Sequence, residues 1–330
     1  MLTRYLLPTC LVGAAIVTIT APSYGAEALL PTQVAKIAKY TAVRIEPTIS
    51  SPGSGVVIGR YNKKGQKEYV ILTAAHVVKH LDDEYQVISP WPIAGNEREK
   101  IKIDNKDIQI LPGLDLALIK FCSDRDYQAA TIGDSDTVTE GSGVYVAGFP
   151  DPGAAIKRRV FQFTGALVSS RLDGDAVQGE AERGPLAGGY AIIYTNVTRA
   201  GMSGGPVFDV AGRLVGIHGM GDREFAEFAA TNQSGSQVSS TTLGDKTGFN
   251  LAIPVKSFLS AIPNRIGELG AKYDGSEVNG FIASGRGNVP NLSRVNTDDV
   301  RSMKMMEEEN PVNDRSTENS APTNRSPRRF

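Results

Sequence analysis

Residues 198–208 have the sequence TRAGMSGGPVF, and this glycine-rich turn before an apolar strand is the most informative stretch of the chain. Glycine adopts backbone conformations that other residues avoid, so Gly201 can point its N–H, together with that of Ser203, into one cavity. Gly204 and Gly205 allow close approach of neighbouring backbone, and the proline begins the next strand. The stretch therefore predicts a hydroxyl and two backbone donors that face the same cavity.

Short apolar runs separated by turns lie on both sides of this stretch. Many short strands at regular spacing are typical of a sandwich or barrel, so we expect an all-β fold. Residues 254–270 begin with proline, carry spaced apolar side chains and end with glycine, which predicts a closing helix despite Pro263. The runs are GVVIG (55–59), YVILTAA (69–75), DLALIKF (115–121), VYVAGF (144–149), FQFTGALVSS (161–170), YAIIYTNV (190–197), PVFDVAGRLVGIHG (206–219) and FNLAIPV (249–255).

The two ends of the chain differ from this middle part. Residues 1–26 combine Arg4, an apolar stretch and small residues, which is the layout of a secretory signal peptide. An uncleaved anchor is the alternative, but the apolar stretch is shorter than the ~20 residues that span a membrane. Residues 271–330 are polar with mixed charges, which predicts a disordered tail. The folded domain is therefore expected over residues 27–270.

The composition excludes several classes of function. The chain has 330 residues with 35 basic and 36 acidic side chains, 3 His and 2 Cys. This near-balance gives no global field for nucleic acid, and so few His and Cys leave little for a zinc site or a disulfide framework. Cys10 leaves with the signal peptide, and His80 follows His76 without the glutamate of a zinc protease, so it is expected at the surface. We expect no metal, no cofactor and no stable membrane insertion after signal cleavage.

Two further motifs precede the glycine-rich turn. In LTAAHVV an apolar strand runs into small residues and then His76, and in GLDLALIKF Asp115 opens an apolar strand. A buried carboxylate needs a partner, and a histidine is a suitable one. Serine is a weak nucleophile that requires a base, a group to orient the base, and donors for the oxyanion. His76, Asp115 and Ser203 together with the Gly201 N–H supply candidates for all of these.

These motifs resemble the chymotrypsin-like (trypsin-like) serine proteases of bacterial type. The resemblance covers residues 40–265, through TAAH (73–76), DLAL (115–118), GMSGGPV (201–207) and LVGIHG (214–219). It implies two antiparallel six-stranded β-barrels with the active site between them. It also implies roles for the candidates: His76 as base, Asp115 as its orienter, Ser203 as nucleophile, and the amides of Gly201 and Ser203 as the oxyanion hole. Animal digestive members have Asp where this chain has Met202, so activation by an N-terminal ion pair is not expected.

The resemblance also suggests which residues bind substrate. Val197 takes the pocket-base position where relatives that cut after Lys or Arg have Asp, so trypsin-like specificity is disfavoured. Thr198 and His218 resemble the pair that holds a substrate carboxylate in glutamyl endopeptidases, which predicts Glu at P1. The alternative is a structural His218 and a pocket for small apolar side chains. The stretch from Gly219 to Gly221 is expected to pair with an extended substrate.

The sequence thus predicts a monomeric, exported serine endopeptidase, periplasmic or extracellular, that acts on proteins or peptides. A chaperone-type protease of the cell envelope is one alternative, but such relatives append peptide-binding PDZ domains, which the polar residues after Gly270 do not resemble. An inactive protease-like binding protein is the other alternative. Loss of activity usually changes a triad residue, and none is changed here.

Overall fold

The computed structural model describes residues 25–80, 82–95, 97–153, 156–172, 188–221 and 248–279. All of them belong to the first of two compact units of the chain, and this unit ends at Gly285. Residues 1–24 of the predicted signal peptide and the predicted tail from residue 280 onward lie outside the described residues.

Seven antiparallel strands form the first sheet, in the order β6-β5-β2-β3-β4-β8-β7. The strands that lie in its middle are rich in β-branched and aromatic residues, which suit a pleated, buried surface. A short 3-10 turn, Asn105–Asp107, precedes β7. The strands are β2 (Ala42–Pro47), β3 (Gly53–Lys63), β4 (Gln66–Thr73), β5 (Tyr85–Ile88), β6 (Lys100–Ile103), β7 (Ile108–Ile110) and β8 (Ala117–Cys122).

The second sheet contains a closed ring of six strands. The order is β13-β10-β11-β12-β15-β14, and pairing of β13 with β14 closes it, while β9 and β16 extend it in parallel. A second 3-10 turn covers Ser135–Thr137. The strands are β9 (Thr131–Ile132), β10 (Gly143–Gly148), β11 (Gln162–Arg171), β12 (Ile192–Thr195), β13 (Pro206–Asp209), β14 (Leu214–Gly221), β15 (Phe249–Pro254) and β16 (Lys272–Tyr273).

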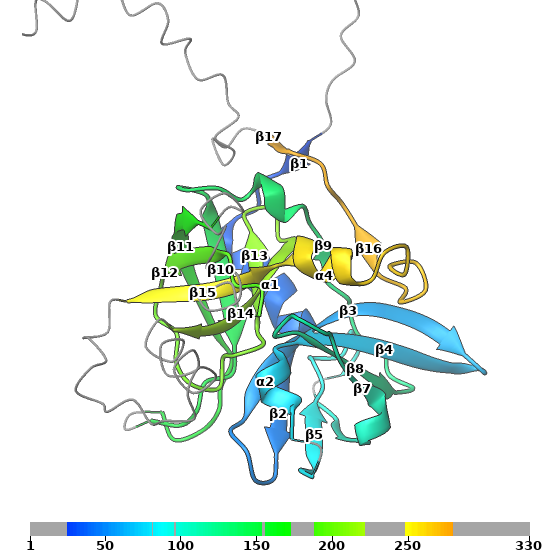
Figure 1. The fold of residues 1–330 in the computed structure, drawn as a ribbon. Helices are drawn as coiled ribbons and strands as arrows, with labels where there is room; N and C mark the ends of the chain where they lie inside the picture. Colours follow the sequence, from blue (N-terminus) through cyan, green and yellow to red (C-terminus); the bar gives the residue numbers. More distant parts are fainter. Residues whose placement is uncertain are drawn as a thin grey trace, which may run out of the picture. The chain divides into compact units, whose positions relative to one another are not determined.

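The prediction of an all-β fold with two barrel-like sheets is confirmed. In Figure 1 the first sheet is blue to teal and the second is green to yellow. The second sheet has the expected ring of six strands, whereas the first has seven strands, and no pairing of β6 with β7 closes it among the described residues.

Buried apolar side chains form three clusters. One cluster lies in the interior of the first sheet, one lies in the interior of the second, and the third lies between the two sheets. The third joins Val56 and Leu72 of the first sheet to Phe208 and Ile217 of the second. Burial of apolar surface stabilises contacts by roughly 25 cal/mol per Å², so this shared cluster holds the two sheets together. The residues with candidate chemistry lie on the segments that follow β4, precede β8 and precede β13.

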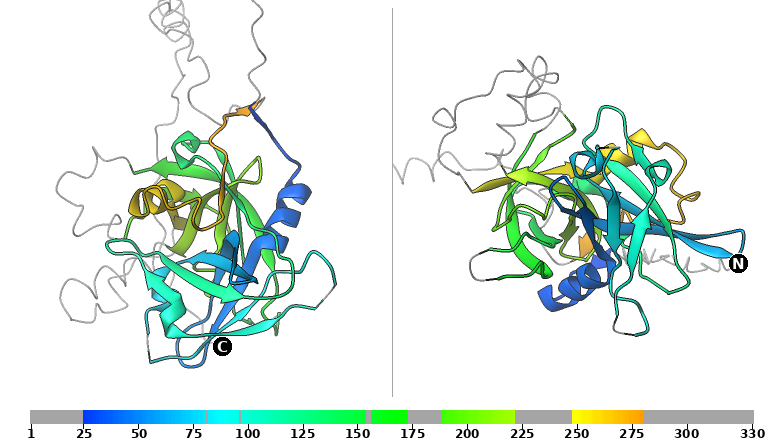
Figure 2. Two further views of the ribbon diagram at one scale, coloured as in Figure 1. Left: turned by 90° about the vertical axis from the view of Figure 1, so that its right-hand side faces the viewer. Right: turned by 90° about the horizontal axis from the view of Figure 1, so that it is seen from below.

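Helix α1 (Pro31–Thr41) was not expected from the sequence. Pro31 occupies a first-turn position, and Val34, Ala38 and Thr41 are buried at the spacing of one helical face. The helix contacts β10 and β13, and Figure 2 shows it beside the green strands of the second sheet. Its apolar face is narrow, because only three of its side chains are buried. The helical pattern in the sequence is therefore weak.

The predicted closing helix is shorter than expected. Helix α4 covers Val255–Ala261 and ends at Ile262, which has φ −126° and ψ 55°. Proline disfavours helical geometry in the residue before it, so Pro263 stops the helix well before Gly270. The expectation of a helix reaching residue 270 was therefore wrong.

The folded part extends past the expected boundary at residue 270. Strand β16 pairs with β9, and β17 (Val278–Asn279) pairs in parallel with β1 (Ala26–Glu27). Residues 271–279, which the sequence predicts to belong to the polar tail, thus contribute a bridge at Ala271 and two short strands to the described unit. Their polar composition concealed this because short edge strands bury few apolar side chains.

Candidate active site

His76 lies in a one-turn helix that follows directly on β4. The strand ends at Thr73, and helix α2 (Ala75–Val78) begins after Ala74. Ala74 and Ala75 are buried, so small side chains allow the chain to turn against the sheet. The His76 backbone N–H donates to Asp115 Oδ1 at 2.8 Å, which fixes the start of this helix to the loop before β8.

Asp115 accepts hydrogen bonds from two side chains. His76 Nδ1 lies 2.6 Å from Asp115 Oδ2, and the Tyr190 hydroxyl donates to the same oxygen at 2.5 Å. Burial alone would raise the pKa of Asp115, but the hydrogen bonds and charge of His76 and the hydrogen bond of Tyr190 outweigh it and lower the pKa. The carboxylate therefore stays ionised and orients the imidazole, which leaves Nε2 for other chemistry.

Tyr190 reaches Asp115 because Gly219 leaves it room. A Cβ on Gly219 would lie 2.0 Å from the Tyr190 hydroxyl oxygen, which no side chain tolerates. Tyr190 itself is fully buried. Gly219 thus contributes to the hydrogen bonding of Asp115 by the absence of a side chain.

The glycine-rich turn has the backbone conformation that its sequence predicts. Gly201 has φ +89°, in the region that favours glycine. The carbonyl before it, Ala200 C=O, accepts from the Asp151 N–H at 2.8 Å. Because C=O and N–H point in opposite directions in a trans peptide, the Gly201 N–H faces away from Asp151. Gly201 and Ser203 both line the cleft that contains His76.

Two side chains donate hydrogen bonds to the Gly201 carbonyl oxygen. Ser54 Oγ donates to it at 2.7 Å, and Arg159 Nη2 donates to it at 3.2 Å. The Ser54 backbone N–H also donates to Ser203 C=O at 2.8 Å. Met202 is fully buried in the core of the second sheet. Apolar packing and these hydrogen bonds therefore fix the turn.

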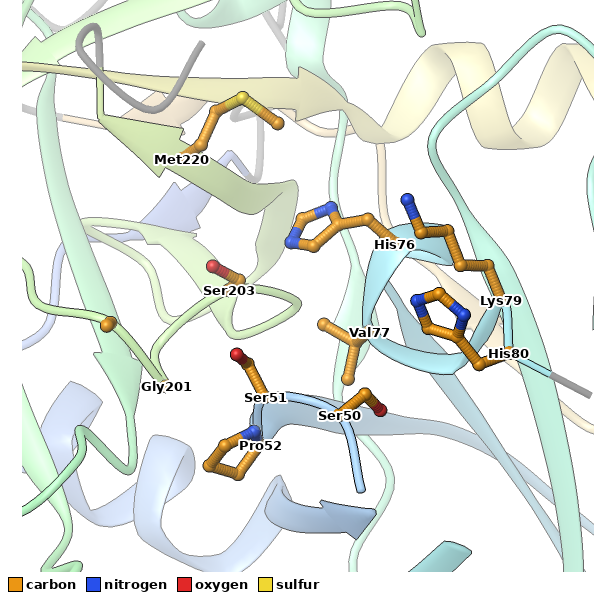
Figure 3. A pocket seen from close by; sticks show the side chains of 11 residues that line it. Ser50, Ser51, Pro52, His76, Val77, Lys79, His80, Gly201, Ser203 and Met220 are labelled. Atoms are coloured by element: carbon orange, nitrogen blue, oxygen red, sulfur yellow. The ribbon is translucent and has the colours of Figure 1, made fainter. Parts of the chain in front are cut away.

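The cleft itself has a volume of about 360 Å³. Figure 3 shows the His76 ring and the Ser203 side chain on facing sides of it, with Ser51 and Met220 as further walls. Within the described residues no hydrogen bond joins Ser203 Oγ to His76. Catalytic hydrogen bonds are often long without substrate and tighten in the substrate complex.

The described part of the chain contains no cluster of three His, Cys, Asp or Glu side chains that could hold a metal ion. His80 is exposed and lines the cleft. None of the described helices is long and apolar enough to cross a membrane.

Comparison with known families agrees with this geometry. The profile of the trypsin-like peptidase domain matches residues 53–217, which is half of the chain and includes both His76 and Ser203. The chain belongs to the trypsin-like peptidase family. The prediction of a chymotrypsin-like serine protease is thus confirmed at the level of the family.

Several solved structures resemble this trypsin-like peptidase. Deg5 is 18% identical over 72% of this chain and 94% of its own, with a TM-score of 0.49. The HtrA-type protease AlgW, solved with a tripeptide, is 20% identical over 74% of this chain, with a TM-score of 0.47. This chain spans 65% of the length of the AlgW chain. A comparison with curated protein sequences finds no match.

Two of the expected specificity residues in this trypsin-like peptidase are an exposed side chain, Val197, and a hydroxyl that bonds within the fold, Thr198. The Val197 side chain is 73% exposed, so it does not form the base of an enclosed pocket in the described residues. The Thr198 hydroxyl donates to the side-chain oxygen of Asn250, which is itself buried. This hydrogen bond connects Thr198 to the start of β15.

His218 is only 2% exposed. Its Nδ1 lies 2.7 Å from the Tyr194 hydroxyl, and its ring also has a hydrogen bond with the Leu251 backbone. Burial is the main cause that lowers the pKa of His218 to about 3, so the imidazole is neutral at physiological pH. Among the described residues, His218 and Thr198 hydrogen-bond to different partners, Tyr194 and Asn250. The contacts of His218 match the alternative of a structural strand residue.

The edge of β14 remains consistent with substrate pairing. Its pairing with β13 ends at Ile217, and the His218 backbone exchanges hydrogen bonds with Gly204 and Gly205. At Gly219 and Met220 this edge has no strand partner among the described residues, whereas the other edge pairs with β15 through Gly221. Sequence reasoning identified this edge but missed Ser54, Tyr190 and Arg159. Of these three residues, only Ser54 lies in a stretch with a local sequence signal, the small residues of GSGVVI (53–58). Tyr190 and Arg159 contact Asp115 and Gly201 over long sequence separations, so no local pattern indicates them.

Proposed function

We propose that this chain is an exported serine endopeptidase that hydrolyses peptide bonds with His76, Asp115 and Ser203. The observation that carries the proposal is the 2.6 Å contact of His76 Nδ1 with the buried Asp115, in a cleft that Ser203 also lines. Export is proposed from the sequence of residues 1–26 alone.

The proposed reaction follows from these roles. Ser203 Oγ attacks the scissile carbonyl carbon while its proton passes to His76 Nε2, and ionised Asp115 stabilises the imidazolium. The Gly201 and Ser203 N–H groups stabilise the oxyanion. The C–N bond then breaks as His76 returns the proton to the leaving amine. Water attacks the acyl-enzyme ester, with His76 again as base, and releases the carboxylic acid and Ser203.

The decisive variant is Ser203→Ala in the purified chain, assayed on casein and for labelling by a serine-directed organophosphate. The expected results are a loss of about 10⁶-fold in kcat and no labelling, with an unchanged circular dichroism spectrum. Ser51→Ala is the matched control, because Ser51 lines the same cleft but has no proposed role in the chemistry. Its kcat should stay within about threefold of wild type.

Retained turnover in Ser203→Ala would remove the catalytic assignment. A wild-type chain that neither cleaves casein nor reacts with the organophosphate would establish the alternative of an inactive, protease-like binding protein.

The preference for Glu at P1 stays a prediction, and the contacts of His218 argue against it. A peptide-library digest with the wild-type chain tests it directly. Cuts mainly after Glu would support the preference, whereas cuts after small apolar residues, Lys or Arg would exclude it.

A further inference from the structure

A second cavity, of about 690 Å³, lies outside the catalytic cleft and shares none of its lining residues. Helix α1, strand β2 and the segments after β5 and β10 contribute to it. Small-molecule sites in proteins usually have volumes of about 300–1,000 Å³, so this cavity has the size of a ligand site.

The cavity carries a strong excess of positive charge. Its lining has one carboxylate, that of Glu46, against five basic side chains, which are Lys39, Arg44, Arg98, Arg158 and Arg159. Glu46 lies 2.9 Å from Arg44 Nε and 3.8 Å from Arg159 Nη1, and Asp151, which does not line the cavity, lies 3.5 Å from Arg159 Nε. Within the described part of the chain, Lys39, Arg98 and Arg158 have no carboxylate within ion-pair distance.

Aromatic rings hold the cationic groups in place. The Arg98 guanidinium carbon lies 4.4 Å from the centroid of Trp91 and 4.6 Å from that of Phe149, and Lys39 Nζ lies 4.8 Å from Trp91. Cation–π contacts of this kind fix a cation without neutralising its charge. Arg98 also donates to the carbonyls of Ile88 and Ser89, so its orientation is set before any ligand arrives. The Arg98 and Lys39 cations are therefore preorganised, and neither is paired with a carboxylate among the described residues.

We propose that this cavity binds the phosphate group of a small phosphorylated ligand. A phosphate monoester carries a charge of about −1.5 to −2 at pH 7 and three acceptor oxygens, which suits several cations better than a single carboxylate does. Guanidinium groups bind phosphate oxygens in a bidentate manner. The Trp91 and Phe161 rings, which meet edge to face, give an apolar wall for the rest of the ligand.

The site can be followed by fluorescence because Trp91 is the single tryptophan of the chain. The full chain is titrated with inorganic phosphate and with pyrophosphate, and with sodium chloride at matched ionic strength. We expect a saturable change in Trp91 emission with both phosphates, tighter for pyrophosphate, and no saturable change with chloride. The measurement needs no proteolytic activity, so its outcome is independent of the proposed function.

Two exposed cations at the rim allow a specific variant. Lys39→Gln with Arg158→Gln should weaken pyrophosphate binding at least about tenfold, which corresponds to ~1.4 kcal/mol. Lys36→Gln with Lys157→Gln is the matched control, because these exposed lysines lie on the same segments but do not line the cavity. The control should bind within about twofold of wild type.

Three outcomes would overturn the proposal. The first is the absence of a saturable response to either phosphate. The second is an equal loss of pyrophosphate affinity in the two double variants, which would show that the binding depends on the general positive charge of the surface and not on this cavity. The third is binding to phosphatidylserine vesicles or duplex DNA without any affinity for pyrophosphate, which would assign the positive charge to a macromolecular surface.

Discussion

Ser54 joins the two sheets at the turn that carries Ser203. Its side chain donates to Gly201 C=O at 2.7 Å and accepts from the Phe149 N–H at 2.9 Å, and it is fully buried. A buried carbonyl or N–H that loses its partner costs about 1–3 kcal/mol. Ser54 is therefore expected to keep the Gly201 peptide in the orientation that the oxyanion hole needs.

Ser54→Ala should lower kcat by about 10- to 100-fold with little change in KM, because a misplaced oxyanion donor weakens the transition state more than substrate binding. Ser135→Ala is the matched control, since Ser135 is equally buried and its hydroxyl also accepts a backbone N–H, that of Lys256, away from the cleft. Both variants should lose stability in urea titrations. Equal kcat values in the two variants would show that Ser54 has only a structural role.

At this scale the sequence predicted what local chemistry determines. The positive φ of Gly201 follows from the glycine itself, and the positions of His76 and Asp115 follow from the end of β4 and the start of β8 beside them. Tyr190 and Ser54 could not be found in this way. They contact Asp115 and Gly201 across 75 and 147 residues of sequence, and only the tertiary fold creates those contacts.

On strand β14, His218 has the surroundings of a buried structural residue, and its predicted role in binding a substrate carboxylate stays a prediction. His218 is 2% exposed with Nδ1 at the Tyr194 hydroxyl, and the pairing of β14 with β15 shifts register directly after it, between His218 and Met220. Such a bulge inserts one residue and changes which face the following side chains occupy. The sequence pattern contains no sign of it, since glycines are common in strands of this kind.

The buried His218 should make the protein sensitive to acid. An unfolded histidine has a pKa near 6.5, and burial lowers the folded value to about 3. Between these values the unfolded state binds one more proton, so stability is full above pH 6.5 and falls as the pH drops towards 3. The contribution of one proton is about 1.4 kcal/mol per pH unit. Urea unfolding of wild type and His218→Gln between pH 7.5 and 4.5 should show a shallower loss in the variant.

The exposed His80 provides the control for this measurement. His80→Gln removes an exposed imidazole instead of a buried one, so measuring it in parallel separates the effect of His218 from the general effect of replacing a histidine by glutamine. If the unfolding free energies of wild type and His218→Gln changed in parallel with pH, the assignment of His218 as a buried, neutral imidazole would be wrong.

For the whole molecule, the residues beyond Gly270 complete the described unit. The buried Arg213 pairs with Asp209, and its Nη1 donates to the backbone carbonyls of Ser276 and Asp274. Strand β17 also pairs with β1, so the two ends of the described unit are hydrogen-bonded to each other. A sequence pattern could not show this, because two-residue strands carry no periodicity.

A chain that ends at Gly270 should be less stable than one that ends at Asn279. It would leave Arg213 with fewer acceptors and remove the β9–β16 and β1–β17 pairs, at a cost of about 2 kcal/mol or more. For a domain of this size that lowers Tm by about 4–8 °C. Differential scanning calorimetry should find the chain ending at Asn279 within about 2 °C of the full chain, and equal Tm values for both truncations would refute the assignment.

The proposed catalytic residues are divided between the two halves of the fold. His76 and Asp115 belong to segments next to β4 and β8 of the first sheet, whereas Ser203 precedes β13 of the second. The only covalent link between the sheets in this region is the segment that leads from Cys122 to Thr131. Two fragments produced by a cut in this segment would each carry an incomplete set of the proposed catalytic residues. Hydrolytic activity would therefore be recovered only when the fragments associate through the shared apolar cluster. Enzymatic turnover would then serve as a reporter of fragment complementation.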